Sequence, residues 1–155
     1  MRLRLEQNNE GTEEVVIRYE TMTEKLKGFI GYIKQYTTEL QGKKKGELYR
    51  IETKEIYYIE SVDGKSFLYG EEEVYETDRT LKQLEKQLEA LGFVRISKSC
   101  ILNCRKLVRV KAEENHRMRV FLENEESLIV NRTYLGHLKE ALKQLSEGRW
   151  KGAIV

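Results

Sequence analysis

Short runs of alternating apolar and polar residues, separated by polar turns, dominate the chain between residues 47 and 130. The clearest pair of runs is 56–62 and 66–69, which are separated by Asp63 and Gly64. Asp-Gly favours the tight turn of a β-hairpin because both residues tolerate a positive φ angle. Alternation with a period of two places the apolar side chains on one face of a strand. The pattern predicts a mainly β domain, with further strands over 48–51, 74–76, 107–112, 117–122 and 127–130.

Two later segments have apolar residues at helical spacing instead of alternation. In residues 80–91 the leucines fall on one stripe, and Thr80 with Gln83 matches a capping box. Gly92 follows at the position where a glycine commonly ends a helix. A second helix is predicted over about 133–145 from its leucine spacing. We therefore expect an α+β fold that is mainly β, with the stripe of the first helix facing the core.

The start of the chain predicts a strand–strand–helix extension. Residues 2–6 and 14–19 alternate like strands, and Thr21 with Glu24 matches another capping box. The helix that follows should end near residue 40, and its apolar stripe comprises Leu26, Phe29, Ile30 and Ile33. This stripe has to be covered, either by the β core or by a second copy of the chain.

A run of glycines and lysines at 42–46 is the best linker candidate in the sequence. It divides the chain into an extension with a regulatory or dimerisation role, 1–46, and a main domain, 47–148. The remaining residues, 149–155, are expected to form a flexible tail.

Length and composition limit the class of protein. A chain of 155 residues corresponds to one domain, or to one domain with a small extension. With 39% hydrophobic and 35% charged residues, the composition is that of a soluble globular protein. No apolar run approaches the roughly 18 residues of a membrane span, and the N-terminus is too polar for a signal peptide. The expected compartment is the cytoplasm.

Motifs of catalysis and metal binding are missing from the sequence. There is no Gly-rich phosphate loop, no HExxH and no GxSxG, and neither histidine has a nucleophile near it. Cys100 and Cys104 would lie about 13 Å apart on one strand. A disulfide requires Cα atoms within about 7 Å, so buried free thiols are expected. We predict no enzyme activity, no catalytic residue, no cofactor and no metal ion.

The segment FVRISKSCILNCRKLVRV, residues 93–110, combines an apolar strand pattern with a polar side that is cationic or hydrogen-bonding. No acidic residue occurs between Arg95 and Lys111. Residues 95–155 carry 13 Lys and Arg against 7 Asp and Glu, whereas residues 47–94 carry 6 against 12. This asymmetry predicts either an electrostatic binding surface in the last third of the chain or simply well-solvated strand faces.

This cationic segment resembles the core motif of the LytTR family of DNA-binding domains. The family pattern is an aromatic residue, x, Arg, x, a polar pair, Ser, x, two aliphatic residues and Asn. The matching residues are Phe93, Arg95, Ser97, Lys98, Ser99, Ile101, Leu102 and Asn103. IYYIESVDGKSFLY resembles the strand–turn–strand of the family, and ESLIVNRTYLGHLKEAL resembles its closing strand and helix. The resemblance extends over residues 47–145, about two thirds of the chain.

The resemblance implies an elongated, sandwich-like β structure whose edge loops enter successive major grooves of duplex DNA. Base contacts would come from Lys65 and Ser66, from the turn at Lys98, and from Arg132. Arginine can donate two hydrogen bonds to guanine, and lysine can reach the same acceptors. Many relatives carry histidine near the middle of the second site, where Ser97 and Lys98 stand here, so the base preference stays open.

Phosphate contacts are expected from the cationic and hydrogen-bonding residues around these loops, because such groups neutralise or donate to phosphate oxygens. They are Arg95, Ser97, Ser99, Arg105, Lys106, Arg109 and Asn131. Two alternatives remain at this stage. Arg95 could instead pair with a carboxylate such as Glu60, and Asn103 could close its turn with its side chain.

The function implied by the resemblance is a bacterial transcription regulator that binds double-stranded DNA sequence-specifically, with two copies on imperfect direct repeats. The residues before the β region are too few for a phosphate-receiving domain, so control would come from abundance, a partner or self-association. Candidate partners are a second copy on DNA, RNA polymerase, and a small membrane protein of the kind encoded beside some short relatives. The alternative function is a protein-interaction module of the same fold whose basic face docks an acidic partner.

Overall fold

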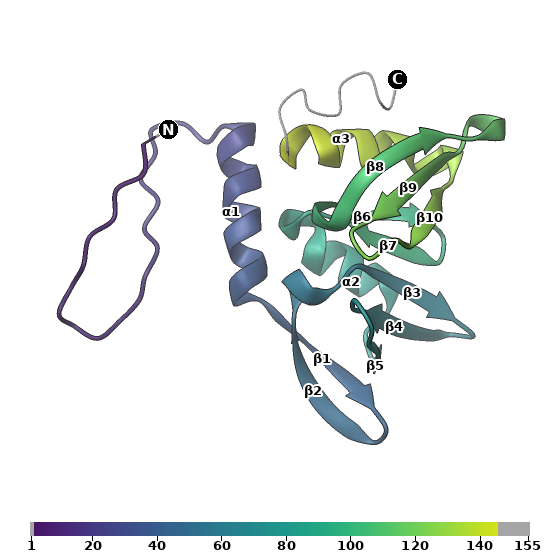
Figure 1. Cartoon of the computed structure of the whole chain (residues 1–155), viewed down its shortest axis with the longest axis horizontal. Coiled ribbons are helices and arrows are strands. Elements are labelled where there is room, and N and C mark those ends of the chain that lie inside the picture. The colour runs from purple at the N-terminus through teal and green to yellow at the C-terminus, as the bar shows by residue number, and fades with distance from the viewer. Residues whose placement is uncertain (1, 146–155) are drawn as a thin grey trace.

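Antiparallel hairpins build most of the molecule, as the alternation predicts. The computed structural model describes residues 2–145 (Figure 1). One sheet has seven strands in the order β2-β1-β5-β4-β3-β7-β6, and a second has three in the order β10-β9-β8. The bounds are β1 Glu39–Lys44, β2 Glu47–Glu52, β3 Tyr58–Val62, β4 Lys65–Tyr69, β5 Val74–Thr77, β6 Phe93–Ser97, β7 Cys100–Asn103, β8 Leu107–Ala112, β9 Met118–Leu122 and β10 Ser127–Val130.

The predicted hairpin turn at Asp63 and Gly64 is confirmed. The two residues have φ angles of 51° and 77°, and Val62 pairs with Lys65 across the turn. Two successive positive φ angles give the turn a twist that matches the right-handed twist of the flanking strands. The Asp-Gly dipeptide thus fixes the register of β3 and β4.

Two helices cover the large sheet on opposite sides. α2, Leu81–Leu88, packs its leucines on one face together with Ile59, Leu68 and Ile101. α3, Leu135–Leu145, and the small sheet pack on the other face, against side chains such as Leu102. β7 therefore contributes to both cores, because its successive side chains point to opposite faces. The mainly β, α+β prediction is confirmed.

The predicted caps of α2 are present. The Thr80 hydroxyl accepts a hydrogen bond from the Gln83 amide at 3.2 Å, and the Gln83 side chain accepts one from the Thr80 amide at 3.0 Å. Gly92 ends the following 3-10 turn with a φ of 93°. α3 begins two residues later than predicted because residues 132–134 form a 3-10 turn.

The N-terminal strands predicted at 2–6 and 14–19 do not form, and residues 2–22 contain no strand or helix. Two strands alone are marginal in water, and alternation by itself supplies no pairing partner. α1, Glu24–Thr37, is present, but its N-cap is Thr23 rather than Thr21. The Thr23 hydroxyl accepts from the Leu26 amide at 3.1 Å. We call residues 2–20 the N-terminal arm, which projects away from the body (Figure 1).

The predicted linker at 42–46 is wrong, because most of it belongs to β1. Gly42 pairs with Tyr49 across the β1–β2 hairpin. A Cβ atom at Gly42 would lie 2.4 Å from Ile51 and 2.7 Å from Tyr75. The glycine is therefore required by close packing between strands, which the sequence does not distinguish from a flexible loop. The proposed division between residues 46 and 47 consequently falls inside a hairpin.

No described helix is long and apolar enough to cross a membrane. The tail predicted at 149–155, together with the end of the main domain at 146–148, lies outside the described residues.

Candidate nucleic-acid interface

The three segments expected to contact DNA lie at one edge of the molecule. The Ser61 amide, just before the β3–β4 turn, donates to the Ser99 carbonyl at 2.8 Å. The Asn131 amide, just after β10, donates to the Ile96 carbonyl at 3.0 Å. Because Ile96 and Ser99 flank the β6–β7 turn, these two bonds join all three segments across both sheets. Figure 1 shows the β3–β4 and β8–β9 turns on the same side of the molecule.

Arg95 organises the β6–β7 turn from inside. Its Nε donates to the Ser97 carbonyl at 2.8 Å, and its Nη2 donates to the Lys98 carbonyl. Its Nη1 lies 2.9 Å from a carboxylate oxygen of Glu85 on α2, and the Arg95 side chain is only 17% exposed. The guanidinium is thus used within the protein, which argues against the expected phosphate contact. A carboxylate partner was anticipated, but it is Glu85 and not Glu60.

The serines close the same turn and leave Lys98 at its tip. The Ser97 hydroxyl oxygen accepts from the Ser99 amide at 3.2 Å. Ser97 is half-buried, whereas Lys98 and Ser99 are exposed. The backbone of this turn is therefore held by Arg95 and Ser97, while the Lys98 ammonium and the Ser99 hydroxyl face the solvent.

In the first segment, the structure separates Lys65 from Ser66. Lys65 is exposed and lies 3.8 Å from Glu76, but Ser66 is only 5% exposed. Successive side chains of β4 alternate, so neighbours in sequence point to opposite faces. The structure therefore argues against the expected base contact of Ser66, because the hydroxyl of this residue is inside the protein.

In the third segment, Asn131 and Arg132 are both exposed. Asn131 begins the 3-10 turn that precedes α3, but its side chain does not cap this turn. The Asn131 backbone amide is used by Ile96. This bond fixes the position of Arg132 relative to the β6–β7 turn while leaving the guanidinium outside.

Arg105 and Lys106 lie at the opposite end of β7 and are held by other protein groups. Arg105 donates to the carbonyls of Gly28 at 2.8 Å and Leu91 at 3.3 Å, and burial lowers its pKa. Lys106 lies 3.7 Å from Glu123, and its side chain is only 22% exposed. Because protein groups already hold Arg105 and Lys106, the structure does not support the phosphate contacts that were expected of these two residues.

The last two residues considered in the sequence, Arg109 and Asn103, differ in exposure. Arg109 is exposed midway along β8, with its guanidinium carbon 3.5 Å from the centre of the Phe121 ring. It remains available to an anion on the surface of the small sheet. Asn103 is fully buried, and its side chain accepts from the Arg105 amide at 3.1 Å and donates to the Ile56 carbonyl at 2.8 Å. The alternative that Asn103 closes its turn is confirmed.

Two exposed cations at the same edge were missed from the sequence. Arg79 lies two residues after Thr77, which pairs with Ser66 near the start of β4, beside the β3–β4 turn. Arg117 precedes Met118, which pairs with Val130 at the end of β10. Acidic residues lie close to both arginines in the sequence, so a count of net charge along the chain does not reveal them. Strand register places them near the three segments, and no sequence signal gave that register.

The two cysteines of the chain are not exposed. Cys100 and Cys104 are buried free thiols, as predicted, and burial raises the pKa of each to about 12. A thiol with such a pKa is a poor nucleophile at neutral pH. Within residues 2–145 there is no cluster of three His, Cys, Asp or Glu side chains that could hold a metal ion.

Known proteins share the sequence and the fold of this region. The family model of the LytTr DNA-binding domain matches residues 46–143. The chain is 27% identical over 95 residues to the sensory transduction protein LytT of Enterococcus faecalis, covering 61% of this chain and 39% of that protein. It is 30% identical over 93 residues to LytT of Bacillus cereus, covering 60% and 38%. The chain thus spans about two fifths of the length of these relatives.

A solved structure shows the same fold. The LytTr DNA-binding domain of a Bacillus cereus protein superposes with a TM-score of 0.64 at 19% identity, covering 68% of this chain and 96% of that one. At this identity the likeness establishes the fold alone. The family model, however, matches well over half of the chain. With the motif and the fold in agreement, the chain belongs to the LytTR family of DNA-binding domains.

Proposed function

We propose that this chain is a cytoplasmic bacterial transcription regulator that binds double-stranded DNA sequence-specifically through loops entering successive major grooves. The observation that carries the proposal is the joining of three exposed segments at one edge by the Ser61–Ser99 and Asn131–Ile96 hydrogen bonds. Each segment presents a cation that is not buried: Lys65, Lys98 or Arg132. Such an edge can bind duplex DNA, which is a polyanion with hydrogen-bond acceptors at regular positions. This role requires no enzymatic activity.

The side chains divide into two roles in this proposal. Lys65, Lys98 and Arg132 reach base edges, where lysine and arginine recognise the guanine acceptors. Phosphate contacts come from Ser97, Ser99, Asn131 and Arg109, with Arg79 and Arg117 added from the structure. Phosphate contacts set the register on DNA, and base contacts supply the specificity.

Two copies would bind imperfect direct repeats, because a single domain of this size reaches only part of an operator. RNA polymerase and a small restraining membrane protein remain further candidate partners. The relatives named sensory transduction proteins support a role in signalling, since the matching part of this chain corresponds to their LytTr portion.

Selection of bound sequences from a random duplex library tests the proposal. An enriched motif should emerge, and its affinity should fall with salt at a log–log slope of about −5 if six phosphates are neutralised. A slope flatter than about −2 with no enriched motif would contradict it. In that case the basic edge would instead dock an acidic protein.

A further inference from the structure

Several polar groups attach α1 to the body. Gln35 is only 2% exposed, and its side-chain amide donates to Asn103 at 3.2 Å and to the Leu91 carbonyl. Arg105 donates to the Gly28 carbonyl at 2.8 Å. At Gly31 the helix backbone comes so close to the Ala90 carbonyl that a Cβ atom would lie 2.4 Å from it. At Gly31 the backbone of α1 therefore packs directly against the body.

Only part of the apolar surface of α1 is buried: Leu26 is 8% exposed, and Ile30 and Ile33 are half-buried. Within residues 2–145, neither hydrophobic core includes a residue of α1. Phe29, Tyr32 and Tyr36, at spacings of three and four residues, are 40%, 45% and 50% exposed. Residues so spaced lie along one side of a helix. Of the stripe expected from the sequence only Phe29 is exposed, and together with Tyr32 and Tyr36 it forms an exposed aromatic stripe in a single chain.

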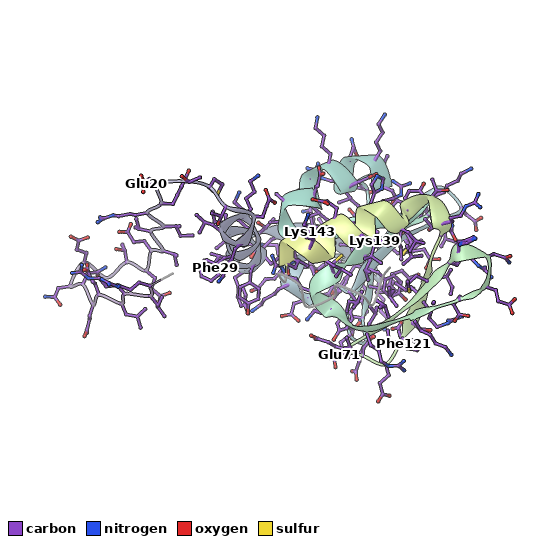
Figure 2. All side chains as sticks on the ribbon, turned by 90° about the horizontal axis from the view of Figure 1, so that it is seen from above. Glu20, Phe29, Glu71, Phe121, Lys139 and Lys143 are labelled. Carbon is purple, nitrogen blue, oxygen red and sulfur yellow. The ribbon has the colours of Figure 1, made fainter. Side chains whose placement is uncertain are left out.

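The N-terminal arm is a second uncovered apolar surface. Leu3, Leu5 and Val15 are 80%, 86% and 68% exposed. The side-chain hydrogen bonds and the ion pair of the arm, among the described residues, join arm residues only. In both views the arm extends from the far side of α1, which lies between the arm and the body (Figures 1 and 2). Large exposed apolar patches of this kind mark sites of association.

The two surfaces also carry opposite charge. Residues 2–20 contain five glutamates and three arginines, whereas residues 24–37 contain three lysines and one glutamate. Glu13 and Glu14 of the arm are exposed, and so is Lys25, which lies one helical turn before Phe29 on the same side of α1. An acidic, strand-like arm is therefore complementary to a basic, apolar helix surface.

We propose that the arm of one copy covers the exposed stripe of α1 on a second copy, so that the chain forms a two-fold dimer without DNA; the two copies on a direct repeat point the same way and therefore belong to different dimers. A helix surface can cover the apolar side chains of an extended segment but offers no backbone partners to it. A two-fold axis brings two arms together, so their backbones pair with each other while their apolar faces lie on α1. The same contact between an arm and α1 therefore occurs twice in the dimer, as in other isologous dimers.

The mass of the full-length chain in solution is the first measurement. Light scattering over a range of concentrations, in the absence of DNA, should give the mass of two chains. Phe29→Glu should weaken the dimer on the order of 100-fold, because truncation or charging of a central aromatic residue removes a dominant contact. Val108→Glu is the matched control, since Val108 is an exposed residue of β8 outside the N-terminal region, and it should remain dimeric.

Charge exchange distinguishes a second copy from folding back within one chain. Glu13→Lys with Glu14→Lys reverses the charge of the arm, and Lys25→Glu reverses the charge beside Phe29 on α1. Each variant alone should dissociate at least about tenfold more readily, because like charges face each other twice. An equimolar mixture should recover the dimer, since both arm–helix contacts then join opposite charges.

Two results would overturn the proposal. One is a parent chain with the mass of a monomer at every concentration, and the other is a mixture that stays monomeric when each variant remains folded by circular dichroism. Both are measured without DNA, so their outcome is separate from that of the proposed regulatory function. Retained binding of Phe29→Glu to random duplex DNA would show that only self-association has been lost.

Discussion

Arg95→Met tests whether Arg95 shapes the β6–β7 turn or contacts phosphate. The substitution keeps the length of the side chain and removes the guanidinium, which holds the Ser97 and Lys98 carbonyls and pairs with Glu85. If the turn depends on these contacts, Lys98 loses its position while the charge facing DNA stays the same. Affinity for the selected operator should then fall more than affinity for random duplex.

The size of the effect on stability follows from the exposure of the partners. A hydrogen bond to a charged group contributes about 1.5–3 kcal/mol when protected. Here the Lys98 carbonyl lies in an exposed turn where water replaces the donor, and Glu85 is 43% exposed, so its ion pair contributes at most about 1 kcal/mol. We expect a total loss of about 2 kcal/mol, which corresponds to about 6 °C in the melting temperature of a domain of this size.

Thermal melts and fluorescence anisotropy titrations at several salt concentrations measure both consequences. Arg95→Met should melt earlier, reduce the ratio of operator to random affinity, and leave the salt slope unchanged. Glu85→Gln is the control, because it keeps both carbonyl contacts and should retain the ratio. A slope that falls by about one unit, with an unchanged melting temperature, would refute the reasoning and assign Arg95 to phosphate.

Three further outcomes are expected from the structure. Lys98→Ala should reduce the ratio of operator to random affinity by about 5- to 150-fold, whereas Lys106→Ala, at the other end of β7, should leave both affinities unchanged in the same titrations. Arg105→Ala should lower the free energy of unfolding in urea by about 2 kcal/mol, because Gly28 and Leu91 lose their donor, without changing the salt slope. Burial raises the pKa of Cys100 and Cys104 from 9.0 to about 12, so the unfolded chain ionises first. Their contribution to stability is complete below pH 9 and lost as the pH rises toward 12, by up to about 1.4 kcal/mol per pH unit for each thiol. Melts at pH 8 to 11 should show a shallower decline when both cysteines are replaced by alanine, and an identical decline would contradict this assignment.

Local sequence determined the elements whose geometry depends on neighbouring residues. Asp63 and Gly64 define their hairpin because the positive φ angles of the turn suit these two residue types. Thr80, Gln83 and Gly92 define the ends of the α2 region because capping bonds join residues within four positions of each other. The family motif likewise located the β6–β7 turn, since its residues are contiguous in the chain.

Tertiary structure decided the roles of residues whose partners lie far away in the sequence or on another element. Gly42 is a packing position and not a linker, because Ile51 and Tyr75 occupy the space that a side chain would need. Arg95 and Arg105 are both arginines in one cationic run, yet one holds the turn and the other anchors α1. Both carry the same charge and lie in the same cationic run, so only the partners that each contacts in the folded structure separate their roles.

The candidate edge is also a product of tertiary structure. Lys65, Lys98 and Arg132 are far apart in sequence, and they are joined through backbone hydrogen bonds of Ser61 and Asn131 that no side-chain pattern encodes. Strand alternation turned Ser66 inward next to Lys65. The sequence by itself determined which residue types could recognise DNA, while strand register and the contact between the two sheets decided which of them face outward together, because the direction of a side chain is set by the backbone that pairs around it.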